Sequence, residues 1–100
     1  MTLQYLLFDY SDNAEEAGSF DAMASVLAPQ VDAVQAEVAQ VLAWAESQFP
    51  GQHGPIEEGG EWDHDLQTTR EQGTPERIVF SLSITGTRPF CEAFREHFDD

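Results

Sequence analysis

The sequence predicts an α+β fold with the element order β-α-β-β-α, in a single domain that spans residues 1–100. Three observations lead to this prediction. Residues 31–49 carry apolar side chains at helical spacing, residues 61–70 and 77–86 alternate between apolar and polar side chains, and residues 2–10 are rich in aromatic and branched side chains. One hundred residues with 41% hydrophobic content suffice for one packed core.

The N-terminal third is expected to hold one strand and one short helical segment. Residues 2–10 fit a strand that is apolar on both faces, and an acidic loop follows over residues 11–19. Residues 20–28 are expected to be helical, with Ser19 as the N-cap. Pro29 interrupts this segment, because the residue before a proline avoids helical geometry.

The long helix that follows has the clearest pattern in the chain. Its apolar stripe consists of Val31, Val34, Val38, Val41, Leu42, Ala45 and Phe49. Such a valine-rich stripe is expected to pack on a sheet rather than to bind a cofactor. The "FPG" at 49–51 ends the helix, and a loop rich in glycine and proline extends over residues 50–60.

Two strands joined by the hairpin loop "EQGTP" are expected next. Because successive side chains of a strand point to opposite faces, the first strand sorts into two sets. Trp62, His64 and Leu66 belong to the apolar face, and Glu61, Asp63, Asp65 and Gln67 belong to the solvent face. On this alternation His64 points away from both aspartates. Matching the apolar faces places Asp63 opposite Ser83 and Asp65 opposite Ser81.

The last element is a short helix with a stripe of phenylalanines, Phe90, Phe94 and Phe98. A right-handed crossover, with the third strand inserted between the first two, gives a three-stranded antiparallel sheet of order 2-3-1 with both helices on one face. This architecture resembles a ferredoxin-like fold that lacks its last strand, and the resemblance implies no function. An alternative is that the first strand pairs differently, because both of its faces are apolar.

In the order 2-3-1 the first strand is a sheet edge without charge or proline over residues 2–8. Such an edge is a template for pairing with another chain. We therefore expect a homodimer, with Leu3, Tyr5 and Leu7 at the dimer edge.

The charge distribution is strongly asymmetric. The formal net charge is −15, and residues 1–69 contain thirteen Asp or Glu but neither Lys nor Arg. The four bases are Arg70, Arg77, Arg88 and Arg95. Such a chain repels phosphate backbones and anionic lipids, so we expect neither direct nucleic-acid binding nor membrane binding. It would attract a basic protein, although solubility or adaptation to high salt would explain the same charge.

The residues that could bind a metal lack the spacing of known motifs. His53, His64, His97 and Cys91 show no CxxC or HxxxH spacing, so no metal and no cofactor are expected. The segment "DYSDNAEEAGSF" fails as an EF-hand loop, because alanine replaces its glycine and phenylalanine replaces its last glutamate. Weak cation binding along the face of Asp63 and Asp65 remains an alternative.

Cys91 is the candidate reactive thiol. It lies in the first turn of the last helix, three residues after Arg88 and four before Arg95, and both cations and helix N-termini stabilise a thiolate. It also flanks the phenylalanine stripe, which favours a buried core residue. A single cysteine forms no internal disulfide, and the chain shows neither a secretory signal nor a run of about 18 apolar residues, so the cytoplasm is the expected location.

These observations favour a small, non-catalytic protein-interaction module that binds or masks a basic, nucleic-acid-binding protein. The acidic surface is expected to consist of Glu15, Glu16, Glu57, Glu58, Asp63 and Asp65. The alternative is a small-molecule-binding or enzymatic subunit, with a pocket at the helix and dimer interface near Cys91 or His64. Charge reversal of the acids would impair only the first of these functions.

Overall fold

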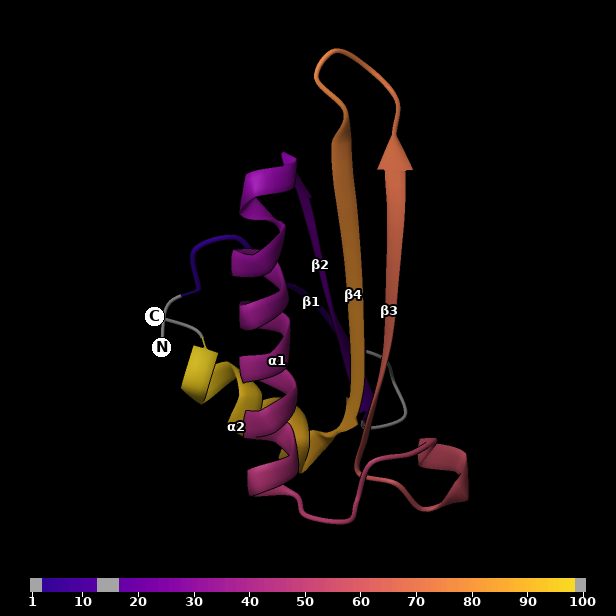
Figure 1. Cartoon of the computed structure of the whole chain (residues 1–100). Helices are drawn as coiled ribbons and strands as arrows, with labels where there is room; N and C mark the ends of the chain where they lie inside the picture. The colour runs from indigo at the N-terminus through magenta and orange to yellow at the C-terminus, as the bar shows by residue number, and fades with distance from the viewer. Residues whose placement is uncertain (1–2, 13–16, 99–100) are drawn as a thin grey trace.

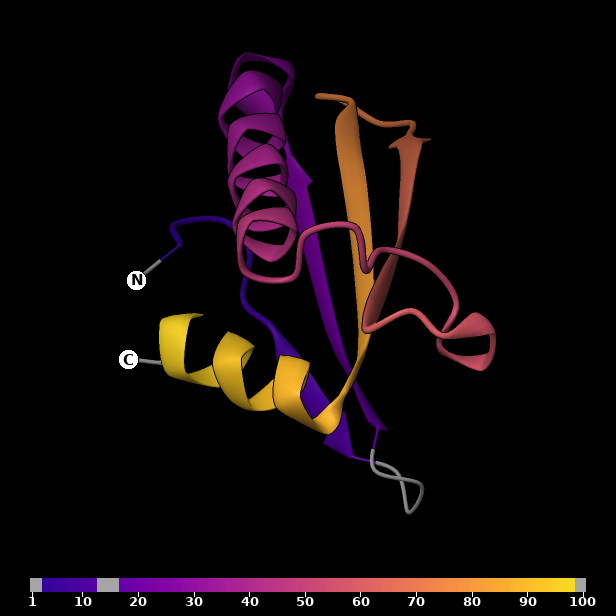
Figure 2. The same cartoon turned by 90° about the horizontal axis from the view of Figure 1, so that it is seen from below.

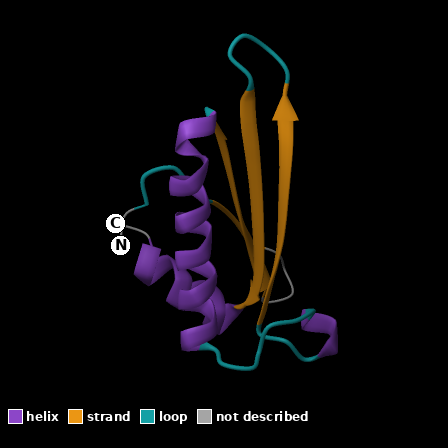
Figure 3. Cartoon of the chain, in the orientation of Figure 1, coloured by secondary structure: helices purple, strands orange, loops and turns teal. Residues whose placement is uncertain are grey.

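Four antiparallel strands form one sheet in the order β1-β2-β4-β3, and two helices cover one of its faces. The computed structural model describes residues 3–12 and 17–98. The strands are β1 (Asp9–Asp12), β2 (Ala17–Val26), β3 (Trp62–Glu71) and β4 (Arg77–Thr87), and the helices are α1 (Val31–Gln48) and α2 (Arg88–Phe98). Short 3₁₀ turns occupy Ala28–Gln30 and Ile56–Glu58. The α+β class is therefore confirmed (Figures 1 and 3).

The predicted three-stranded sheet of order 2-3-1 is wrong, because residues 20–26, which were expected to be helical, belong to strand β2. Strand β2 pairs with β4 along its whole length, from Ala17 opposite Thr87 to Val26 opposite Ile78. Its even-numbered residues from Phe20 to Val26 are buried, and the odd-numbered residues from Asp21 to Ser25 are exposed. Two of the buried positions are alanines, whose high helix propensity obscured the period of two.

The N-terminal segment is also corrected. Strand β1 begins only at Asp9, and it pairs with β2 rather than with the last strand. The backbone N–H groups of Gln4, Tyr5 and Leu6 instead donate to the carboxylate of Glu37 on α1, at donor–acceptor distances of 2.8–3.1 Å. Because these donors are already satisfied, residues 4–6 are not a sheet edge.

The proposed dimer edge loses its structural basis for the same reason. Leu3 and Tyr5 pack against the hydrophobic core, whereas Leu7 is 83% exposed. The three side chains therefore do not form one apolar face on an edge strand. Dimerisation of the chain itself stays a prediction.

The hairpin of β3 and β4 is confirmed, but its register differs from the expected one by two residues. Asp63 lies opposite Thr85 and Asp65 lies opposite Ser83. The difference arises because the pairing ends with Glu71 opposite Arg77, so the loop lies one residue further along the chain than "EQGTP". A shift of two residues leaves the residues on their expected faces, since side chains alternate with a period of two.

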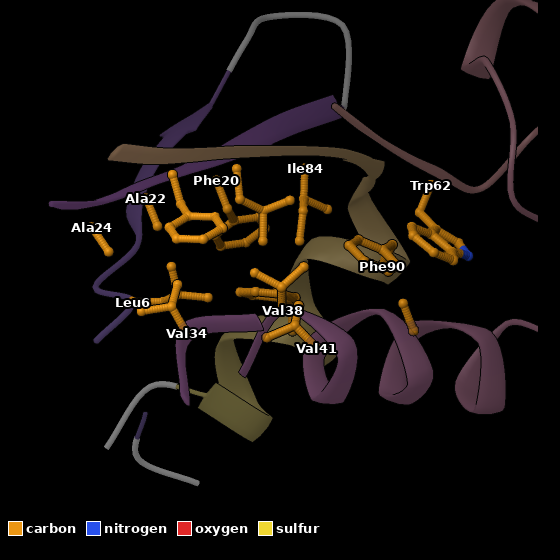
Figure 4. Packing of buried hydrophobic residues seen from close by; sticks show 14 of the residues in the cluster. Leu6, Phe20, Ala22, Ala24, Val34, Val38, Val41, Trp62, Ile84 and Phe90 are labelled. Carbon is orange, nitrogen blue, oxygen red and sulfur yellow. The ribbon is translucent and has the colours of Figure 1, made fainter. Parts of the chain in front are cut away.

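The core fills the space between the sheet and the two helices, which lie on the same side of the sheet (Figure 2). Helix α1 contributes the buried residues Val34, Val38, Val41 and Ala45, as its stripe predicts. Helix α2 contributes Phe90, Cys91 and Phe94. Figure 4 shows side chains of the two helices facing the side chains of β2 and β4. No helix of the described residues covers the opposite face of the sheet.

Candidate functional site

The face of the sheet that carries no helix, here called the open face, presents a row of acidic side chains. Asp9 lies opposite Asp21, Asp21 opposite Ser83, and Ser83 opposite Asp65. The row therefore crosses all four strands in register. Asp9, Asp21 and Asp65 line one open hollow of about 530 Å³, which confirms that they share this face.

The pairing of Asp9 with Asp21 is unfavourable for the isolated chain. Directly opposed residues of antiparallel strands have Cβ atoms about 4.5–5.5 Å apart, and like charges at that distance destabilise the sheet. Arg77, at the hairpin end of the sheet, does not compensate this pair, because its guanidinium donates to the hydroxyl and carbonyl oxygens of Ser25. A cationic group bound over Asp9 and Asp21 would remove the repulsion.

Two exposed apolar side chains border the same hollow. Leu7 is 83% exposed and Met23 is 67% exposed, and both line the hollow beside the acidic row. Lysine and arginine side chains combine a charged end with an apolar stem, so they match this combination of carboxylates and exposed hydrocarbon.

The expected acidic residues are only partly brought together. Asp63 and Asp65 lie on the open face, and Glu57 lines a second hollow of about 610 Å³ together with Asp63. Glu58 is exposed in the neighbouring 3₁₀ turn. The predicted residues Glu15 and Glu16 lie outside the described residues. Sequence reasoning missed Asp9 and Asp21, although the alternation of residues 20–26 places Asp21 on a solvent face.

A second group of polar side chains meets at the outer edge of β3. The Nε2 atom of His53 lies 3.0 Å from Nδ1 of His64 and 3.1 Å from Oδ1 of Asp63. The three ligand atoms lie within 4.8 Å of one another. The expectation that His64 points away from Asp63 is therefore wrong for the ends of the two side chains, which lie close together.

The discrepancy follows from the position of β3 at the edge of the sheet. Alternation fixes the direction in which each side chain leaves the backbone, but it does not fix the position of the side-chain end. The Asp63 carboxylate turns back and accepts the backbone N–H of its neighbour His64 at 2.8 Å. His53 approaches from the loop and forms a parallel bridge with Trp62.

The loop that carries His53 is held by backbone hydrogen bonds to the start of β3. Gly54 donates to the carbonyl of Trp62 and Glu61 donates to the carbonyl of Gln52, each at 2.8 Å. The imidazole of His53 also packs on the Trp62 indole, with ring centroids 4.3 Å apart. The bridge joins positions 53 and 62, so no local sequence pattern could have revealed it.

Cys91 lies in the core, in the first turn of α2. Its side chain is 2% exposed, and its sulfur lies 3.5 Å from the carbonyl oxygen of Gly86. Burial raises the pKa of the Cys91 thiol above its ordinary value of 9.0, with smaller opposing effects that include Arg95. A neutral, buried thiol is a weak nucleophile, so this environment favours the core interpretation over the reactive one.

The raised pKa of Cys91 predicts a loss of stability at alkaline pH. The unfolded thiol ionises first, so its contribution to stability is complete below about pH 9 and decreases as the pH rises toward the higher folded pKa. Each pH unit in that window removes at most about 1.4 kcal/mol. Urea unfolding measures the free energy of unfolding at about pH 8 and about pH 10. Between these two values it should decrease less for Cys91→Ala than for the unmodified chain. Equal decreases in the two proteins would contradict this assignment.

Among residues 3–12 and 17–98, no helix is long and apolar enough to cross a membrane. Comparison of the chain with family models, with curated proteins and with solved structures finds no match.

Proposed function

We propose that the chain is an acidic interaction module whose open face binds a basic segment of another protein. The observation that carries this proposal is the row of Asp9, Asp21 and Asp65, which crosses the sheet in register and lines a single hollow. Neither the net charge nor solubility requires carboxylates to be opposed on neighbouring strands.

The partner that fits this surface is an extended segment rich in lysine or arginine. Its cationic groups would lie between Asp9 and Asp21 and next to Asp65, while its aliphatic stems would contact Leu7 and Met23. Binding would relieve the repulsion within the free module, which adds to the affinity. Because the contacts are exposed, affinity must fall as ionic strength rises.

The alternative of a small-molecule-binding subunit has weaker support. The hollow next to Cys91, lined by Tyr10 and Arg95 among others, has a volume of about 190 Å³. Ligand pockets in proteins are usually about 300–1,000 Å³. Two larger hollows, of about 530 and 610 Å³, are open and lie on the acidic face.

The experiment compares two triple variants that change the net charge equally. One replaces the acidic row, with Asp9→Asn, Asp21→Asn and Asp65→Asn. The other replaces exposed acids of the helices, with Asp32→Asn, Glu92→Gln and Glu96→Gln. A labelled peptide of alternating lysine and leucine is titrated into each protein at low salt, and the fluorescence anisotropy is measured.

We expect the variant of the acidic row to bind the peptide at least tenfold more weakly than the helix variant. Added salt should weaken binding to the unmodified chain. Equal affinities of the two variants would show that the peptide responds to net charge alone, and this result would overturn the proposal. Circular dichroism establishes that both variants are folded.

A further inference from the structure

We propose that His53, Asp63 and His64 bind a divalent transition-metal ion at the outer edge of β3. This inference does not depend on the proposed docking function, although Asp63 lies at the border of the open face. The chemical class is an ion of borderline softness such as Zn²⁺, because two of the three donors are imidazole nitrogens.

The spacing of the donors fits a metal ion of this size. With metal–donor distances of about 2.0–2.1 Å, two donors of a tetrahedral site lie about 3.3 Å apart. The separations from His53 Nε2 are 3.0 Å to His64 Nδ1 and 3.1 Å to Asp63 Oδ1. The third pair of donors, His64 Nδ1 and Asp63 Oδ1, lies within 4.8 Å. Adjustments of the side-chain ends, outward for His53, would bring all three donors to the spacing of a tetrahedral site.

The donors are also held in place by contacts that do not involve the ion. His53 is fixed by its bridge with Trp62, and its ring stacks on His64 with centroids 4.9 Å apart. The Trp62 indole beneath His53 is itself 2% exposed and stacks on Phe90, with an interplanar angle of 8°. His53, which lies close to both other donors, therefore rests on a core residue. Preorganised ligands lose less conformational entropy when the ion binds.

The site remains accessible to solvent. The side chains of His53 and Asp63 are 40% and 35% exposed. A zinc ion bound by three protein groups keeps a fourth position for water or for a donor from a ligand. The site is therefore of the open type, and the acidic surroundings would raise the local concentration of cations.

The same three groups can also hold one another by hydrogen bonds alone, and this competing interpretation has to be tested. Hydrogen bonds between the two imidazoles require no ion and give no preference among metals. A nonspecific cation on the acidic row is the other competing interpretation, and it favours hard ions bound by oxygen. The proposed site differs from both, because only there does zinc bind with an affinity that depends on His53 and His64.

Zinc is titrated into the full chain by isothermal titration calorimetry, in buffer with excess magnesium to occupy exposed carboxylates. We expect one zinc per chain. The affinity should fall at least tenfold in His53→Ala and in His64→Ala. His97→Ala is the matched control, because this histidine stacks on Trp44 of α1 and should leave zinc binding unchanged.

A second measurement does not depend on variants. In nitrogen NMR spectra of the unmodified chain, zinc should shift Nε2 of His53 and Nδ1 of His64, but not the nitrogens of His97. The proposal would be overturned by the absence of zinc binding, by equal affinity of the His53 and His64 variants and the unmodified chain, or by shifts confined to His97. If a variant fails to fold, the NMR result decides.

Discussion

Replacing Phe94 with alanine is expected to lower the free energy of unfolding by about 3–5 kcal/mol. The side chain is 1% exposed and lies where the N-terminal segment, the sheet and both helices meet. Its ring is 4.2 Å from that of Phe20 and 5.1 Å from that of Phe8, measured between centroids. Trp44 of α1 contacts it from the helix layer at 5.7 Å.

The size of this effect follows from the aromatic rings that pack around Phe94. The rings of Phe8, Phe20 and Trp44 come from the N-terminal segment, β2 and α1, so collapse into the cavity would require several elements to move together. Phe98→Ala is the control, because this residue lies in the same helix and is only partly buried. In urea unfolding, Phe98→Ala should lower the free energy of unfolding by much less than Phe94→Ala does. Equal losses would contradict the position of Phe94 in the core.

The second large effect is expected for Glu37→Ala, which should lower the free energy of unfolding by about 3 kcal/mol. Hydrogen bonds to a charged group contribute about 1.5–3 kcal/mol each, and this carboxylate accepts three consecutive backbone N–H groups. Partial exposure lowers the sum, because water can replace some of these bonds. The substitution would also release Leu6, which is 4% exposed in the core.

Glu46→Ala provides the matched control for Glu37. Glu46 lies on the same helix and accepts one exposed N–H, from Gly51. We expect its replacement to cost less than about 1 kcal/mol. Urea unfolding of both variants at one pH measures the difference. If both lose the same stability, the N-terminal segment is not held by the Glu37 carboxylate.

The elements predicted from sequence are those in which one residue type dominates each face. The valine stripe of α1 and the alternation of β3 and β4 give unambiguous periods, and these elements are found where expected. Strand β2 was missed, because alanine is small enough for either structure and carries little periodic signal. With β2 misassigned, the neighbour of β4 could not be identified, and the strand order failed with it.

The candidate sites show the same division. Asp63 and Asp65 lie on the expected face, because a period of two fixes the face of a strand whatever its partner. The acidic row required β1 and β2 in register, and the cluster of His53 with His64 required a bridge between a loop and a strand edge. Contacts of that kind arise from packing rather than from local pattern, so sequence reasoning separated residues that the fold brings together.

The one-sided pairing of β3 has a further consequence for local opening. Strand β4 has partners on both sides. Within residues 3–12 and 17–98, β3 pairs with β4 alone, apart from its bridge with His53. Of the residues in β3, only Trp62 is buried. Detachment of the strand beyond Trp62 would therefore expose little apolar surface and leave the rest of the core intact. Amide hydrogens of β3 should accordingly exchange with solvent long before the amide hydrogens of β4 that donate to β2, in an opening that precedes global unfolding.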